Sequence, residues 1–427
     1  MKGEQGGGMI YKTVLENGIR VITEEIPTAH SATLGFWVEN GSRHEDLSQS
    51  GISHFIEHML FKGTERRSAQ EIAKEIDSVG GVLNAFTSRE FSCYYAKVLA
   101  RRLPLAVDLL SDIVLHSILD PDEIEKERRV ILQEIHMVDD TPDDQVHELF
   151  CQTFWENHPL GHSILGTGNT VGKISRDHLL SYLEDRYCGK NILICAAGDL
   201  KHEQLVEHIN QAFRRIKTGE RPPLCSLPDY RRRLNILEKD LEQVHICLGT
   251  RALPQNHPNR FVSYLLNTIL GGGMSSRLFQ NVREDQGLAY SIYSYLNCHS
   301  DAGALVVSSG TSPNEAPKVV NILLKELARF RAEAVSEEEL HSAKEQLKGN
   351  LLLSLESTDN RMTRLAKNEI YLGRNLSIKE VIRGIDQVSA DDIQKLAGFI
   401  FKDDYLNLQM VGKVRESDYP LSGLTLA

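Results

Sequence analysis

Long apolar runs are missing from this sequence of 427 residues. No stretch reaches the roughly eighteen consecutive apolar residues of a membrane-spanning helix, so we expect no membrane as a partner. The first residues, MKGEQGGGM, lack the apolar core of a secretory signal. We therefore interpret residues 1–8 as a leader or tag and expect a cytoplasmic protein.

Paired cysteines and an excess of basic residues are also missing. The seven cysteines are scattered and form no C-x-x-C pair, which argues against a disulfide framework and a cysteine-built zinc site. The formal net charge is −11, which disfavours nucleic acid as a partner. Hydrophobic residues make up 41% and charged residues 25% of the chain, the composition of a globular protein.

The chain is organised as two halves with a similar succession of elements. Region 217–233, KTGERPPLCSLPDYRRR, has three prolines and little apolar periodicity, which predicts an interdomain linker. In 9–216 the patterns predict a hairpin around Asn17-Gly18, then helices, a strand pair and a long helix. A similar succession recurs in 234–427, about 210 residues later. We therefore predict an α+β fold of two duplicated domains, each a mixed or antiparallel sheet flanked by helices.

The sharpest local pattern is SHFIEHML at 53–60, within a helical segment. His54 and His58 are four residues apart, so both imidazoles project from one helix face and can share one Zn²⁺. Glu57 lies beside them, where its carboxylate can take a proton from a zinc-bound water without being a ligand. The order H-x-x-E-H is the inverzincin motif of metallopeptidases.

A third ligand must come from elsewhere in the chain. The predicted helix that starts at Asp120 carries Glu127 and Glu134, which are two turns apart on one face. One of them can bind the metal while the other orients a ligand histidine. The spacing alone leaves open which glutamate does which.

A rival histidine pair, His158 and His162, has the same spacing. Pro159 and Gly161 lie between the two histidines and favour a loop over a helix, and no glutamate accompanies them. We therefore interpret this pair as structural.

Several segments together resemble the pitrilysin (insulinase) family of metallopeptidases. Within it, the chain is similar to the short branch that includes the catalytic subunit of mitochondrial processing peptidase and its bacterial relatives. The resemblance runs from about Met9 and rests on GISHFIEHMLFKGT (51–64), NAFT (84–87), 127–135 and SRLFQNVREDQGLAY (276–290). In this family the third ligand stands 76 residues after the second histidine, at Glu134 here. The resemblance thus implies zinc on His54, His58 and Glu134, supported by Glu127.

The resemblance also implies how the substrate binds. A peptide is expected to add as a strand along the edge formed by Leu83–Thr87, with contacts to Asn84, Ala85 and Phe86. Arg283 and Tyr290 match an arginine and a tyrosine that the family's C-terminal domain contributes to the active site. Both can donate hydrogen bonds to the substrate carbonyl and to the charge that develops on it.

The second half carries no equivalent metal ligands. Aligning the repeats places Leu265, Thr268 and Ile269 opposite the H-x-x-E-H residues, and Asn350 near the position of Glu134. We therefore expect one zinc per chain. Because one chain holds the metal ligands together with Arg283 and Tyr290, we expect a homodimer whose four domains enclose a chamber.

The resulting hypothesis is a zinc metalloendopeptidase that hydrolyses unfolded peptides or presequence-like segments, with Glu57 as catalytic base. One alternative is a dedicated maturation protease for a single small peptide. Another is a non-catalytic scaffold subunit of the same fold, which the complete ligand set disfavours.

Overall fold

The structure is a computed structural model that describes residues 8–222 and 226–426. Most of the leader expected at 1–8 and residues 223–225 of the expected linker lie outside the described residues. Among the described helices, none combines the length and apolar character needed to cross a membrane. The chain divides into two compact units, each assembled from non-contiguous segments.

Unit 1 is built on a six-stranded sheet with the order β1-β2-β6-β3-β5-β4. Only the β2–β6 pair is parallel. The strands are β1 (Met9–Val14), β2 (Arg20–Glu25), β3 (Ser31–Val38), β4 (Val82–Thr87), β5 (Ser92–Leu99) and β6 (Ile192–Gly198). The predicted hairpin at Asn17-Gly18 joins β1 to β2, and Gly18 adopts φ +92°, which favours glycine. The strand predicted as a binding edge, β4, is the last strand of the sheet.

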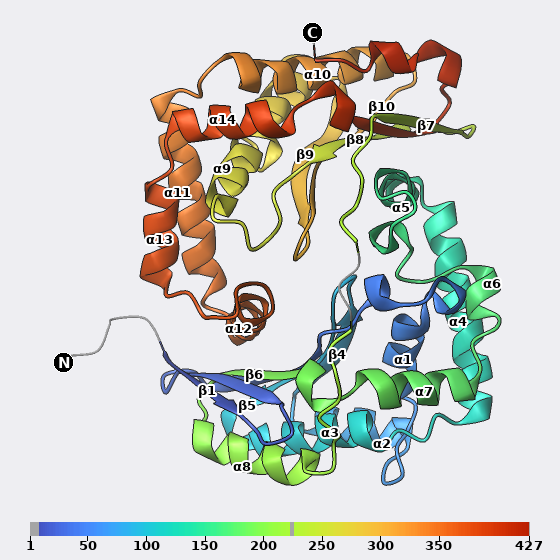
Figure 1. The fold of residues 1–427 in the computed structure, drawn as a ribbon, viewed down its shortest axis with the longest axis vertical. Helices are drawn as coiled ribbons and strands as arrows, with labels where there is room; N and C mark the ends of the chain where they lie inside the picture. The colour runs from blue at the N-terminus through green and yellow to red at the C-terminus, as the bar shows by residue number, and fades with distance from the viewer. Residues whose placement is uncertain (1–7, 223–225, 427) are drawn as a thin grey trace. The chain divides into compact units, whose positions relative to one another are not determined.

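Both faces of this sheet are buried, as the alternation along its central strands shows. On β6, Ile194 and Ala196 face the larger core while Leu193 and Cys195 face a second cluster. The helices that contribute to the larger core are α1 (Ile52–Leu60), α2 (Ala69–Ser78), α3 (Leu103–Leu115), α4 (Pro121–Asp140), α6 (Gly168–Val171), α7 (Arg176–Arg186) and α8 (His202–Phe213). The opposite face is covered by α12 (Thr358–Leu372) (Figure 1).

Unit 2 repeats the plan with a five-stranded sheet of order β7-β11-β8-β10-β9, in which only β7 and β11 are parallel. Its strands are β7 (Arg233–Glu238), β8 (Val244–Arg251), β9 (Ala289–Cys298), β10 (Gly303–Thr311) and β11 (Asn407–Gly412). The prediction of two similar α+β domains with mixed sheets flanked by helices is therefore confirmed. Sequence reasoning placed neither β7 nor β11.

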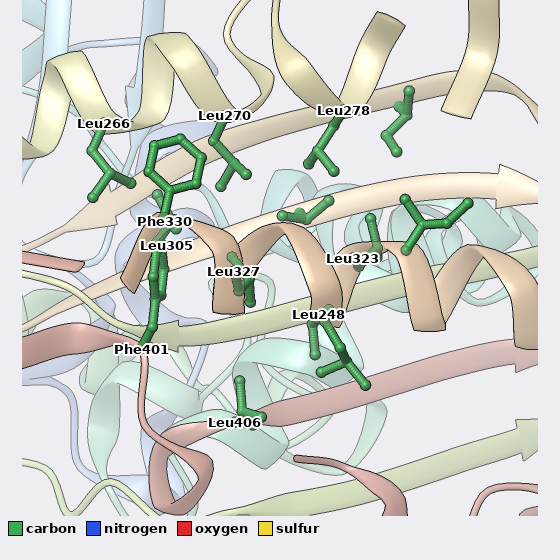
Figure 2. Packing of buried hydrophobic residues seen from close by; sticks show 14 of the residues in the cluster. Leu248, Leu266, Leu270, Leu278, Leu305, Leu323, Leu327, Phe330, Phe401 and Leu406 are labelled. Atoms are coloured by element: carbon green, nitrogen blue, oxygen red, sulfur yellow. The ribbon is translucent and has the colours of Figure 1, made fainter. Parts of the chain in front are cut away.

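The core of unit 2 lies between the sheet and α9 (Arg260–Gly271), α10 (Ala316–Ala332), α11 (Glu337–Ser354), α13 (Ile378–Asp386) and α14 (Ala390–Ile400). Figure 2 shows leucines of α9 and α10 meeting Leu248 of β8 and Leu305 of β10. The other face of the sheet is covered by α5 (Pro142–Phe154). Gly249 makes room for this helix, because a Cβ there would lie 2.2 Å from the ring of Phe150.

Each unit takes one helical segment from the other half of the chain. Within the described residues, unit 1 comprises 8–135, 162–222 and 353–375, and unit 2 comprises 136–161, 226–352 and 376–426. The sequence predicted two contiguous domains, 9–216 and 234–427, with a linker between them. The units of the structure are instead non-contiguous. The structure assigns α12 to unit 1 and α5 to unit 2, an exchange for which the linear pattern carries no signal.

Candidate metal centre

Helix α1 carries the H-x-x-E-H residues and is held at its start by a buried carboxylate. Glu45 is 6% exposed and accepts hydrogen bonds from the backbone N–H groups of Gly51 (2.8 Å) and Ser53 (2.9 Å). These donors lie at the N-terminal end of the helix, where the backbone has no partner of its own. Five fully buried residues of α1 anchor its opposite face: Ile52, Phe55, Ile56, Met59 and Leu60.

Helix α4 supplies the glutamates. It begins as predicted, because Asp120 Oδ1 accepts from the backbone N–H groups of Asp122 and Glu123 at 2.9 and 3.2 Å. The core residue Ile131 fixes the rotation of the helix. Glu127 and Glu134 then project from one face toward the histidines of α1.

His54, His58 and Glu134 converge in the way a metal requires. Glu134 Oε2 lies 3.6 Å from both His54 Nε2 and His58 Nε2. Among the described residues this is the one group of three or more histidine, cysteine or carboxylate side chains close enough to hold a metal ion. Two ligands on a tetrahedral zinc lie about 3.3–3.5 Å apart. The three ligand atoms here lie within 4.8 Å of one another, so the donor set can close around Zn²⁺.

The protonation state of His54 also fits a metal. Burial, helped by neighbouring His58, lowers the pKa of His54 to about 4, so its imidazole is neutral at neutral pH. His54 Nδ1 is buried and has no hydrogen-bond partner among the described residues, whereas Nε2 faces Glu134. Nε2 of the neutral His54 ring is therefore the atom that can point at the metal position.

Glu127 orients the His58 ring through the ring nitrogen that does not face Glu134. Its Oε2 lies 3.0 Å from His58 Nδ1, so Nδ1–H donates to the carboxylate and Nε2 is left as the ligand atom. Lys62 Nζ lies 2.6 Å from Glu127 Oε1. Burial would raise the pKa of Glu127, but the hydrogen bonds from Lys62 and His58 outweigh it and lower the pKa. This carboxylate therefore stays ionised where it supports the ligand.

Glu57 lies beside the donor set without belonging to it. The Thr87 hydroxyl donates to Glu57 Oε2 at 2.6 Å. Burial raises the pKa of Glu57, opposed by the Thr87 hydrogen bond and His58 and reinforced by Glu134. A carboxylate with a raised pKa is better matched to taking and returning a proton near neutral pH.

The predicted substrate-binding residues lie on β4, against which α1 packs. Among the described strands β4 pairs only with β5, so its outer edge carries unpaired backbone groups. The Asn84 side chain is exposed, and its Oδ1 accepts from the N–H of Ala85. Phe86 is also exposed, with its ring edge-on to Trp37.

Arg283 and Tyr290 belong to unit 2 and lie together there. The Arg283 guanidinium is stacked 5.0 Å from the Tyr290 ring and 4.7 Å from the Phe279 ring. Tyr290 is 81% exposed, so its phenol is available to a ligand.

The rival pair carries no metal site. His158 Nε2 lies 2.8 Å from the backbone oxygen of Ser226, and the segment after it is a short 3-10 turn at Pro159–Gly161. Neither His158 nor His162 belongs to a metal-type group among the described residues. The repeat positions Leu265, Thr268, Ile269 and Asn350 likewise belong to no such group.

Three supporting residues escaped sequence reasoning: Glu45, Lys62 and Thr87. Lys62 stands four residues after His58, so helical spacing could have placed it near the ligands. Thr87 ends the predicted edge strand, but its contact with Glu57 depends on how β4 packs on α1. Glu45 lies in a segment without regular pattern.

Comparison with known proteins shows what this chain is similar to. Residues 20–168 match the family described as Insulinase (Peptidase family M16), and residues 173–347 match Peptidase M16 inactive domain. The zinc protease YmxG of Bacillus subtilis is 40% identical over 397 residues, 93% of this chain and 97% of that protein. A zinc protease of Mycobacterium bovis is 40% identical over 399 residues, 92% and 91% of the two chains. A solved peptidase M16 inactive domain from Pseudomonas fluorescens shares the fold, with a TM-score of 0.89, 18% identity and coverage of 95% and 98%.

The relatives and the His-His-Glu centre together define a zinc metalloprotease, a hydrolase of peptide bonds. The chain belongs to the insulinase family, peptidase family M16. The resemblance predicted from the motifs is thereby confirmed.

Proposed function

We propose that this protein is a zinc endopeptidase that hydrolyses unfolded peptides or presequence-like segments, with Glu57 as its general base and one zinc per chain. The observation that carries the proposal is the convergence of His54, His58 and Glu134, with the Glu57 carboxylate beside them and outside the donor set. Zinc bound there supplies a Lewis acid and lowers the pKa of water toward about 7.

The chain's own residues then carry the proton transfers. Glu57 takes a proton from the attacking water and returns it to the leaving amine, which requires a carboxylate within hydrogen-bond reach of both. Glu127 keeps the His58 ring in one tautomer and orientation throughout. Arg283 and Tyr290 stabilise the charge that develops on the substrate carbonyl oxygen.

The substrate is an extended peptide that pairs with the outer edge of β4. The open edge at Asn84, Ala85 and Phe86 supports this mode, because backbone hydrogen bonds are offered to any extended sequence. Backbone pairing gives loose side-chain selectivity, and the net charge of −11 favours basic substrates.

The proposed assembly is a homodimer in which four domains enclose a chamber. In this arrangement Arg283 and Tyr290 of one subunit serve the zinc of the other, and a two-fold dimer makes two composite sites. A chamber admits unfolded peptides and excludes folded domains.

Metal analysis tests the ligand assignment. His54→Ala, His58→Ala and Glu134→Gln each remove one of three protein ligands, so each variant should lose zinc and activity together. Retention of stoichiometric zinc by all three would refute the assignment.

Digests of a random peptide library by the wild type define the cleavage preference. A single cleaved sequence would favour the maturation protease instead.

Subunit mixing tests the shared site. Glu57→Gln and Arg283→Ala are each expected to be nearly inactive, and random exchange should restore about a quarter of the wild-type sites. Differently tagged subunits confirm the exchange. Verified exchange without recovery of activity would show that Arg283 does not act across the dimer.

A further inference from the structure

Thr87 is the one residue of β4 whose side chain hydrogen-bonds the Glu57 carboxylate within the described residues. The Thr87 hydroxyl donates to Glu57 Oε2 at 2.6 Å, a short charge-assisted distance. The other oxygen, Oε1, accepts no hydrogen bond from the described residues. The two oxygens of the carboxylate are therefore not equivalent, since one is anchored and the other is open.

The Thr87 hydroxyl has a second neighbour on the paired strand β5. Ser92 Oγ lies 3.3 Å from Thr87 Oγ1, and these two residues are cross-strand partners at the end of the β4–β5 pair. Because the single hydroxyl proton of Thr87 is directed to the carboxylate, Thr87 Oγ1 can only accept in this contact, and the Ser92 hydroxyl also lies 3.5 Å from the backbone oxygen of Asn40, to which it donates. The Thr87 hydroxyl thus links the sheet to the base.

We propose that Thr87 is a positioning residue that couples the peptide-binding edge to the general base. Its backbone belongs to the strand along which the peptide adds, while its side chain holds Glu57 Oε2 and presents Oε1 for proton transfer. A peptide that pairs with β4 therefore orders the same strand that orients the base. This inference rests on the proposed function, because it assigns Thr87 a role only through Glu57.

The test replaces the hydroxyl without changing the size of the side chain. Thr87→Val is close to isosteric, Thr87→Ser keeps the hydroxyl without the methyl group, and Thr87→Ala lacks both. The matched control is Thr13→Val on β1, which removes a hydroxyl that lies 2.8 Å from His202 Nε2 at the opposite edge of the sheet. The probe is an internally quenched, unstructured peptide with basic residues, and zinc content is measured for every variant.

We expect Thr87→Val to lower kcat about tenfold, a part of the roughly 10²–10⁴ that a general base contributes. KM should stay within about twofold of the wild type, since the backbone edge that pairs with the peptide is unchanged. Zinc content should also be unchanged. Thr87→Ser should retain most of kcat and Thr87→Ala should not, a comparison that holds even if Thr87→Val folds poorly.

The double variant Glu57→Gln/Thr87→Val separates positioning from an independent effect. If Thr87 acts only through Glu57, the double variant is no slower than Glu57→Gln alone. The proposal is overturned if Thr87→Val keeps kcat within twofold of the wild type, if Thr87→Ser is as slow as Thr87→Ala, or if zinc is lost with activity. Full activity of Glu57→Gln would instead overturn the proposed function, whatever Thr87→Val does.

Discussion

At the scale of single residues, Glu127 supports the metal centre without belonging to its donor set. It holds His58 Nδ1 at 3.0 Å and is itself held by Lys62 at 2.6 Å. A carboxylate in this place fixes the ring orientation and makes the imidazole a more basic ligand. The orientation of the ligand His58 therefore depends on two contacts in series, the ion pair from Lys62 to Glu127 and the hydrogen bond from His58 to Glu127.

We expect Glu127→Gln to weaken zinc affinity by about 10–100-fold, because the amide carries no charge to support the His58 N–H donor. Competition with a chromogenic chelator measures the affinity. The control is Glu125→Gln on the same helix, whose exposed carboxylate pairs with Arg128. Equal affinities for the two variants would remove Glu127 from the metal centre.

A second residue, His44, predicts a pH dependence outside the metal centre. Burial, together with Arg43, lowers its pKa from 6.5 to about 4. Between these values the unfolded chain binds a proton that the folded protein does not, so folding is less favourable as pH falls. The contribution of the neutral His44 side chain to the free energy of unfolding is fully present above pH 6.5 and is lost as pH falls toward 4.

We expect the unfolding free energy of the wild type to fall by up to about 3 kcal/mol more than that of His44→Gln over this pH range. Urea unfolding of chelator-treated protein at several pH values provides the comparison. His136→Gln, at an exposed position on α4, is the control. Parallel curves for the wild type and His44→Gln would contradict the expectation.

The sequence predicted part of this site and could not predict the rest. His54, Glu57 and His58 lie within one helical turn and a half, so local spacing alone placed them on one face. Glu134 lies 76 residues after His58, and its assignment needed the family resemblance. Glu45 and Thr87 act through contacts between elements, which spacing along the chain does not encode.

At the scale of elements, the start of α1 depends on one glycine. Gly51 adopts φ +95°, and a Cβ there would lie 2.6 Å from the backbone oxygen of Leu165. Its N–H donates to Glu45, which holds the helix start in place. The backbone conformation at Gly51 therefore sets the position of the ligand helix.

We expect Gly51→Ala to destabilise the protein by about 2 kcal/mol or more and to weaken zinc binding, through backbone strain and overlap. The control is Gly349→Ala within α11, where an added Cβ meets nothing within 4 Å. That substitution should stabilise the protein by up to about 1 kcal/mol. Chemical unfolding and zinc titration measure both effects. A Gly51→Ala variant as stable as the wild type would contradict this account of α1.

At the scale of the whole molecule, the two halves of the chain complete each other. Helix α12 covers Trp37, Cys93 and Cys195 on one face of the first sheet. It is also held by polar contacts, including Lys12 Nζ to Glu369 Oε1 at 2.7 Å and Thr33 Oγ1 to Asp359 Oδ1 at 2.6 Å. The sequence pattern does not indicate the sheet on which α12 packs.

We therefore expect a fragment of residues 9–222 to expose an apolar sheet face and to fail to unfold cooperatively. Appending residues 353–375 through a flexible linker should restore a cooperative transition and reduce binding of a hydrophobic dye. A fragment 9–222 that folds alone would show that α12 is dispensable for unit 1.

The central claim is that Glu57 moves the proton while His54, His58 and Glu134 hold the zinc. The most direct measurement is the zinc content of Glu57→Gln together with its hydrolysis of an unstructured peptide. The account predicts about one zinc per chain and a loss of at least about 10²-fold in kcat, because the metal is bound but the base is absent. Hydrolysis near the wild-type rate, or loss of zinc together with activity, would contradict it.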